Sequence, residues 1–201
     1  MAEIIFNKYF ENNDNTKKNL KLLHSENWKK IKLGEIISIS SGKRPKQKVD
    51  MQNKEFKYPL YGASSIMGYV NEFLYNEEIL IIGRVGTHGI VQRVKDASFP
   101  SDNTLIIKSK YYNFVYQILK RIDYDSLNTG STQPLLTQKS IKNVEIVLPS
   151  LKLVNKYENY CRNLFNKIDI NNKEIEKLTQ LRDTLLPKLM SGEIDLSEIE
   201  V

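Results

Sequence analysis

Short apolar runs bounded by turn residues dominate the middle of the chain. Four of them are rich in β-branched residues and have the length of strands. They are residues 79–82 (ILII), 90–94 (IVQRV), 104–107 (TLII) and 144–148 (VEIVL). Residues 112–121 instead repeat their apolar positions every three to four residues, which predicts an amphipathic helix. Several short strands with few helices predict an α+β fold and argue against a doubly wound sheet.

Residues 150–190 follow a different pattern, without Gly or Pro between Ser150 and Leu186. Apolar residues recur at alternating steps of three and four, with Asn171 and Arg182 filling two of the positions. This heptad spacing predicts one helix of about 36 residues, roughly 54 Å long. We expect Ser150 to cap its start and Pro187, then Gly192, to mark its end. The apolar seam consists of Val154, Tyr157, Cys161, Leu164, Ile168, Ile175, Leu178 and Leu185.

A helix of that length cannot bury its seam against itself, so it needs a second helix. The partner helix could come from the N-terminal segment, from another copy of the chain or from another protein. A helix packed inside one larger domain is the open alternative. With a partner helix, the seam predicts a coiled coil.

The patterns divide the chain into four parts. Residues 1–27 begin with apolar residues at helical spacing and continue into a polar stretch, which predicts a helix end and a linker. Residues 28–149 form the mixed α/β domain, residues 150–190 the long helix, and residues 191–201 a C-terminal tail.

Positive charge is concentrated in the middle part. Residues 28–148 hold 18 Lys and Arg against 11 Asp and Glu, whereas residues 149–201 hold 8 against 9. A local excess of this kind attracts a polyanion such as DNA. A lysine-rich composition that only aids solubility explains the charge equally well.

The motifs of common enzymes are absent from the sequence. It has no P-loop, no nucleophile elbow and no clustered metal ligands, so we expect no catalysis, no cofactor and no metal. Asp50 with Glu55 and Lys57 leaves a Mg²⁺-dependent nuclease as a weak alternative. A single cysteine, Cys161, excludes a disulfide scaffold and favours a reducing cytoplasm. The chain shows neither a signal-peptide core nor an apolar run that could span a bilayer.

Two kinds of side chain are candidates for contact with DNA. Lys43, Arg44 and Lys46 surround Pro45 in a predicted loop and could meet phosphates, which supply affinity. Side chains with directed donors and acceptors read bases, and they gather on three loops beside predicted strands. These are Arg84, Thr87 and His88; Ser101, Asp102 and Asn103; and Ser131, Thr132 and Gln133. Ordinary turn chemistry is the alternative for each loop taken singly.

Five segments, taken in order, resemble the specificity subunit of type I restriction-modification systems. They are residues 28–36, 58–70, 81–89, 130–151 and 178–192, of which GSTQPLL at 130–136 with VLPSL at 147–151 is the most specific. Residues 4–10 (IIFNKYF) resemble the tail of the family's first helical region. The second segment adds Ser64 to the candidate DNA contacts.

The resemblance implies a fold and a set of partners. Members of the family carry two target recognition domains separated by paired long helices, and each domain reads half of a bipartite site. The helices dock methyltransferase subunits, which bring S-adenosylmethionine and the chemistry, and indirectly the restriction subunit.

This chain holds one recognition domain and one full helix. We therefore expect a half-length, cytoplasmic, non-catalytic subunit that binds double-stranded DNA. Its helix would pair as an antiparallel coiled coil with another copy or with another recognition half. A coiled-coil scaffold with an incidental basic domain is the alternative.

Overall fold

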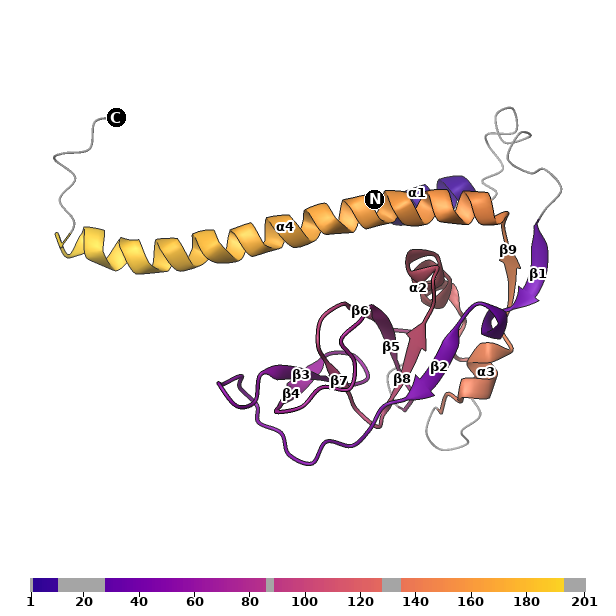
Figure 1. Cartoon of the computed structure of the whole chain (residues 1–201), viewed down its shortest axis with the longest axis horizontal. Coiled ribbons are helices and arrows are strands. Elements are labelled where there is room, and N and C mark those ends of the chain that lie inside the picture. The colour runs from indigo at the N-terminus through magenta and orange to yellow at the C-terminus, as the bar shows by residue number, and fades with distance from the viewer. Residues whose placement is uncertain (1, 11–27, 86–88, 128–134, 194–201) are drawn as a thin grey trace. The chain divides into compact units, whose positions relative to one another are not determined.

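Figure 1 shows a computed structural model of the chain, which describes residues 2–10, 28–85, 89–127 and 135–193. The chain forms two compact units, Met1–Glu158 and Asn159–Val201. In the described ranges, no helix is both long and apolar enough to cross a membrane.

A four-stranded antiparallel sheet forms the centre of the first unit, in the order β2-β8-β5-β6. Its strands are β2 (Ser38–Ser41), β5 (Ile79–Gly83), β6 (Val91–Val94) and β8 (Thr104–Lys108). The register places Leu80 opposite Ile107 and Ile82 opposite Leu105. Every residue of β5 is buried, as expected for an apolar run between two neighbouring strands. The strands predicted at 79–82, 90–94 and 104–107 are thereby confirmed.

Two smaller sheets complete the strands. β4 (Ile66–Val70), β3 (Tyr58–Tyr61) and β7 (Phe99–Pro100) form a three-stranded sheet in that order, in which β3 runs antiparallel to β4 and parallel to β7. β1 (Lys29–Lys32) pairs with β9 (Glu145–Leu148), which confirms the strand predicted at 144–148. The strands β1–β4 and β7 were not predicted, because polar, aromatic, Gly or Pro residues interrupt their apolar pattern.

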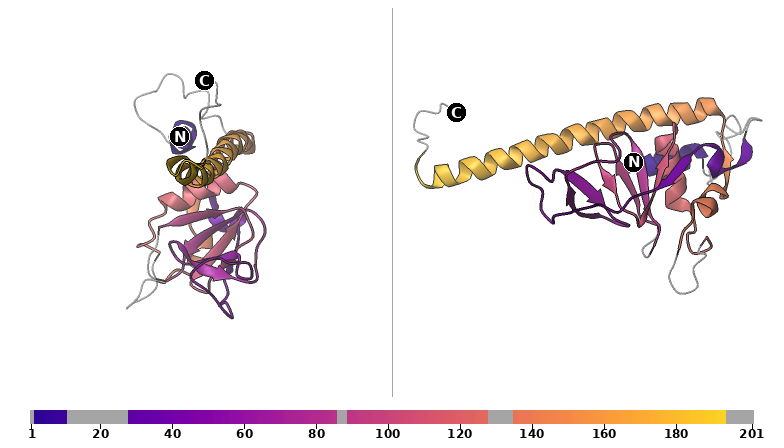
Figure 2. Two further views of the ribbon diagram at one scale, coloured as in Figure 1. Left: turned by 90° about the vertical axis from the view of Figure 1, so that its left-hand side faces the viewer. Right: turned by 60° about the horizontal axis from the view of Figure 1, so that its bottom comes forward.

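The helix α2 (Tyr112–Arg121) covers the four-stranded sheet at β5 and β6 (Figures 1 and 2). Its side chains Phe114, Val115 and Leu119 are fully buried, which confirms the predicted amphipathic helix. The Tyr112 hydroxyl donates to the Ile79 carbonyl at 3.2 Å. Burial raises the pKa of the Tyr112 hydroxyl to about 12. Two short helices, η1 (Leu33–Glu35) and α3 (Gln138–Lys142), join the strands near their ends.

The helix α1 (Ala2–Phe10) packs on this unit through an aromatic cluster. The Phe6 and Phe10 rings lie 5.7 and 5.3 Å from the ring of Tyr157, and 5.8 and 5.3 Å from that of Phe114. The Arg121 guanidinium stacks 4.3 Å from the centre of the Phe6 ring. The helix predicted at the N-terminus is confirmed, and its apolar face covers Tyr157, a seam residue of the long helix.

Glu158 joins the beginning of the long helix to α2. Its carboxylate accepts hydrogen bonds from the Asn113 backbone N–H at 3.1 Å, the Asn113 side-chain amide at 2.8 Å and the Phe114 N–H at 2.7 Å. These backbone donors belong to the first turn of α2, whose own N-cap residue Tyr111 makes no side-chain cap. A carboxylate at a helix N-terminus accepts hydrogen bonds from the free backbone N–H groups and interacts favourably with the positive end of the helix dipole. Glu158 therefore caps a helix that lies 44 residues earlier in the chain.

The long helix α4 runs from Leu151 to Met190, 40 residues without interruption. Our expectation that Pro187 begins the end of the helix is wrong, because the helix passes through it. Proline removes one donor and has a fixed φ that a helix accommodates, and the Pro187 carbonyl still accepts from Ser191 at 2.9 Å. Gly192 ends the helix as predicted. It has a φ of +74°, and the Gly192 and Glu193 N–H groups bond back to Leu189 and Lys188.

The predicted seam has two different environments along α4. Val154, Tyr157 and Cys161 are buried, and Leu164 is half-buried. Farther along, Ile168, Ile175, Leu178 and Leu185 are 36–60% exposed. The predicted α+β domain and long helix are thus confirmed, while the pairing of the helix as a coiled coil stays a prediction.

We predict that Glu158→Gln destabilises the first unit. The substitution keeps the side-chain shape but replaces charge-assisted hydrogen bonds with neutral ones and sets an amide NH₂ against N–H donors. The free energy of unfolding should fall by about 2 kcal/mol, measured by urea denaturation. Glu176→Gln, an exposed position of the same helix, is the control and should change little. Equal stability of the two variants would contradict the capping role.

Candidate nucleic-acid interface

A basic loop, residues 42–57, connects β2 to β3 and is attached to the three-stranded sheet at two points. At its start, the Lys43 N–H donates to the Pro100 carbonyl at 3.1 Å, and Lys43 forms a parallel bridge with Ser101. Farther along, Val49 and Tyr69 exchange backbone hydrogen bonds of 3.0 and 2.8 Å. The intervening side chains are therefore carried on backbone that is held at both ends.

Gly42 permits the first attachment. A Cβ atom at this position would overlap the Ser101 carbonyl oxygen and lie 2.5 Å from that of Pro100. The Gly42 N–H donates to the Thr104 carbonyl at 3.1 Å. Only a residue without a side chain lets β2 approach the turn after β7 this closely. The sequence pattern gave no sign of the close approach at this glycine.

Backbone hydrogen bonds bring together the described residues that belong to, or flank, the three loops named from the sequence. The Arg84 N–H donates to the Asn103 carbonyl at 2.8 Å, and the Arg84 carbonyl accepts from the Leu136 N–H at 2.9 Å. Val85 forms an antiparallel bridge with Leu135. The loop after β5, the turn after β7 and the segment before α3 therefore converge. Five of the candidates lie outside the described residues: Thr87, His88, Ser131, Thr132 and Gln133.

The turn between β3 and β4 lies beside the same loops. The Tyr61 carbonyl, next to this turn, accepts from the Ser101 N–H at 2.9 Å. The turn itself is closed by a bond of 2.8 Å from the Gly62 N–H to the Ser65 carbonyl. The exposed candidate Ser64 is within this turn. Ser64 is thereby placed near Ser101 and Lys43, which are far from it in sequence.

Exposure separates the described candidates by role. Lys43, Arg44, Lys46, Ser64 and Asn103 are exposed, and Arg84 is partly exposed. The Ser101 side chain is only 1% exposed, and its hydroxyl has no hydrogen-bond partner among the described residues. A side chain this buried is out of reach of a ligand in this conformation. Ser101 organises the loops through its backbone, so we assign it a structural role.

The charge of the basic loop is largely uncompensated. Residues 42–57 hold six basic and two acidic residues, a net charge of +4. Lys43, Arg44, Lys46 and Lys48 are exposed, and none forms an ion pair within the described residues. Their cations are available to an external anion. Such a surface is chemically suited to bind a phosphate backbone.

The weak nuclease candidate also lies in this loop. Asn53 shapes the loop there, because its side-chain oxygen accepts from the Glu55 and Phe56 N–H groups at 2.9 and 2.8 Å. Within the described ranges, no group of three or more His, Cys, Asp or Glu side chains could hold a metal ion. The geometry thus offers no support for metal-dependent cleavage by Asp50, Glu55 and Lys57.

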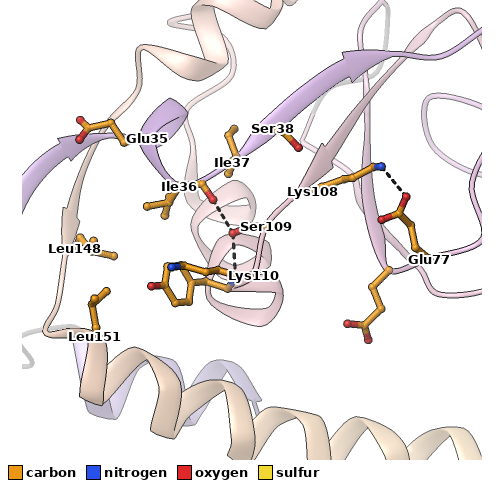
Figure 3. A pocket seen from close by; sticks show the side chains of 12 residues that line it. Glu35, Ile36, Ile37, Ser38, Glu77, Lys108, Ser109, Lys110, Leu148 and Leu151 are labelled. Atoms are coloured by element: carbon orange, nitrogen blue, oxygen red, sulfur yellow. Dashed lines mark hydrogen bonds and ion pairs between the residues drawn. The ribbon is translucent and has the colours of Figure 1, made fainter.

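A cavity of about 540 Å³ lies elsewhere on the first unit, beside β2 and β8 (Figure 3). Inside it, the Lys108 ammonium pairs with the Glu77 carboxylate at 2.6 Å, and the Ser109 hydroxyl donates to the Ile36 carbonyl at 2.7 Å. Its charged lining residues are Glu35, Glu77, Glu78, Lys108 and Lys110. Acidic groups outnumber basic ones, and none of the predicted DNA contacts lines the cavity, so it is separate from the basic surface.

The fold resembles that of a known crystal structure. The crystal structure of a type I restriction-modification system S subunit from M. genitalium has a similar fold, with a TM-score of 0.59 and 24% sequence identity. The similarity covers 85% of this chain and 47% of that one.

The family follows from the sequence of most of the chain. Residues 25–180 match the model of the type I restriction modification DNA specificity domain, and the chain belongs to this family. It is 26% identical to the MjaIX specificity subunit of Methanocaldococcus jannaschii, over 96% of this chain and 49% of that protein. It is 24% identical to the EcoprrI specificity subunit of Escherichia coli, over 78% of this chain and 39% of that one. The chain thus spans about half the length, or less, of these curated relatives.

We predict that Gly42→Ala destabilises the interface. The new methyl group must push β2 away from the turn that carries Asn103, which costs about 1–3 kcal/mol of unfolding free energy by analogy with overpacked cores. Thermal unfolding followed by circular dichroism measures the loss. Ser38→Ala, at an exposed position of the adjoining strand β2, is the control. A Gly42→Ala protein as stable as this control would show that the close approach is unimportant.

Proposed function

We propose that this chain is a DNA sequence-recognition subunit of a type I restriction-modification complex and reads one half of a bipartite target. The observation that carries the proposal is the convergence of separate loops beside an uncompensated basic loop. Lys43, Arg44 and Lys46 would hold phosphates. Arg84 and Asn103, with Ser64 and the candidates at 87–88 and 131–133, would face the bases. Membership of the specificity-domain family supports this assignment.

The subunit would be non-catalytic and would act in the cytoplasm without a cofactor of its own. Its curated relatives are named specificity subunits of type I restriction enzymes. We propose that methyltransferase subunits dock on the helices and carry the methyl-transfer chemistry. The restriction subunit would join through them.

The second part of the proposal concerns α4. Its exposed seam of Ile168, Ile175, Leu178 and Leu185 needs a partner helix, because these side chains would otherwise leave apolar surface in water along most of the helix. The chain spans half the length of its MjaIX relative. We propose that α4 pairs as an antiparallel coiled coil with another copy of this chain.

A coiled-coil scaffold is the second candidate function, and the same exposed seam favours it. It differs in leaving the basic loop without a role. DNA affinity and its dependence on salt therefore decide between the two functions.

We predict that the triple substitution of Lys43, Arg44 and Lys46 by Ala flattens the salt dependence of DNA binding. The logarithm of the affinity should fall less steeply with the logarithm of salt, by up to about 0.9 for each lost phosphate contact. Fluorescence anisotropy with a random-sequence duplex, between about 50 and 200 mM salt, gives the slope.

The control for that measurement removes the same charge elsewhere. Lys167, Lys173 and Lys177 are exposed on α4, and none is a seam residue. Their replacement by Ala should leave the slope close to that of the unmodified chain. Equal slopes for both triple variants would leave the basic loop without a specific role, and no salt dependence at all would favour the scaffold.

We predict that Leu164→Asp with Leu178→Asp abolishes self-association. Two carboxylates in an apolar seam face burial without partners, which is unfavourable enough to separate the helices. Sedimentation velocity should show a dimer for the unmodified chain and a monomer for the variant. Asn163→Asp with Gln180→Asp adds the same charge at exposed positions outside the seam and should remain dimeric. A monomeric unmodified chain would contradict pairing with a second copy.

A further inference from the structure

Two adjacent apolar side chains are exposed at the beginning of β4. Ile66 is 47% and Met67 is 41% exposed, whereas Val70 of the same strand is buried. Individual exposed apolar residues are ordinary, so the surroundings of Met67 decide whether it has a role.

Met67 lies over the turn that joins β3 to β4. A Cβ atom on Gly62 would overlap the Met67 sulfur and lie 2.5 Å from its Cγ. Gly62 is itself held, because its carbonyl accepts from the Gln92 side-chain amide at 2.8 Å and its N–H donates to Ser65. The thioether therefore rests on a fixed part of the backbone, close to Ser64.

The basic loop runs past this turn. It begins at Lys43, which bonds to Pro100 and bridges Ser101, and the Tyr61 carbonyl just before Gly62 accepts from Ser101. It reaches the far edge of β4 at Val49, which pairs with Tyr69. The backbone between these two attachments carries Arg44, Lys46 and Lys48. Met67 is thus an exposed apolar group on the strand that the basic loop joins at Val49. The exposed cations of that loop form no ion pair within the described residues.

This combination fits the major groove of DNA. The cations match the phosphates, and the one apolar group that bases present in that groove is the C5-methyl of thymine. A long, flexible thioether adapts readily to such a contact. We propose that Met67 is a specificity-determining residue that contacts a thymine methyl group. The inference rests on the proposed DNA recognition and adds to it one apolar contact that no hydrogen-bonding candidate supplies.

The test begins with a duplex selected by the full-length chain from a random-sequence library. Each thymine of that duplex is then replaced in turn by deoxyuridine, which lacks only the methyl group. We expect one replacement to weaken binding about fourfold, the effect of losing one buried methyl group. Met67→Ala should bind the thymine and deoxyuridine duplexes equally at that position. Met67→Gln, which keeps the length of the side chain, should also lose the preference.

The control is Val147→Ala, which removes an apolar side chain that is 46% exposed on β9. It should retain the preference for thymine. The inference is overturned if Met67→Ala still distinguishes thymine from deoxyuridine, or if no replacement affects the unmodified chain. In both cases the chain would still select a sequence, so the proposed function would stand. A chain that selects no sequence at all would overturn the proposed function together with the inference.

Discussion

The first unit depends on the hydrogen bonds that the Glu158 carboxylate accepts from Asn113 and Phe114. This carboxylate belongs to the first turns of α4, yet it satisfies the backbone donors at the start of α2. The Arg93 side chain adds a bond of 2.8 Å to Asn113, the residue that Glu158 holds twice. A buried carboxylate is tolerable only when its oxygens are bonded in this way. The first turns of α4 are therefore fixed to the start of α2 within the first unit.

The candidate interface is built mainly from backbone contacts. Bonds from Lys43, Arg84 and Ser101 connect segments that are distant in sequence, and Gly42 lets two of them approach. Backbone attachment leaves the side chains at the surface free to vary without loss of the scaffold. This arrangement suits the proposed task of reading DNA, because substitution of the surface side chains would change the sequence that is read while the scaffold stays the same.

The same heptad pattern in α4 serves two purposes. At the beginning of the helix, Val154 and Tyr157 are buried, and the aromatic residues of α1 contact Tyr157. Farther along, Ile175 and Leu178 remain exposed. The periodicity is continuous between these regions, so a sequence reading treats them alike. Packing within the first unit, including α1 against Tyr157, distinguishes the part of the seam that folding covers from the part that the proposed partner would cover.

The sequence by itself determined the long helix, the apolar strands β5 and β8, and the helix α2, because each has a strong local periodicity that no competing pattern weakens. The end of α4 shows the limit of local rules, since Pro187 lies within the helix and Gly192 terminates it. Tertiary structure alone decided that Ser101 is buried, that Gly42 lies against its carbonyl, and that Met67 lies against Gly62. These facts depend on contacts between segments far apart in the chain, and such contacts leave no periodic signal in the sequence.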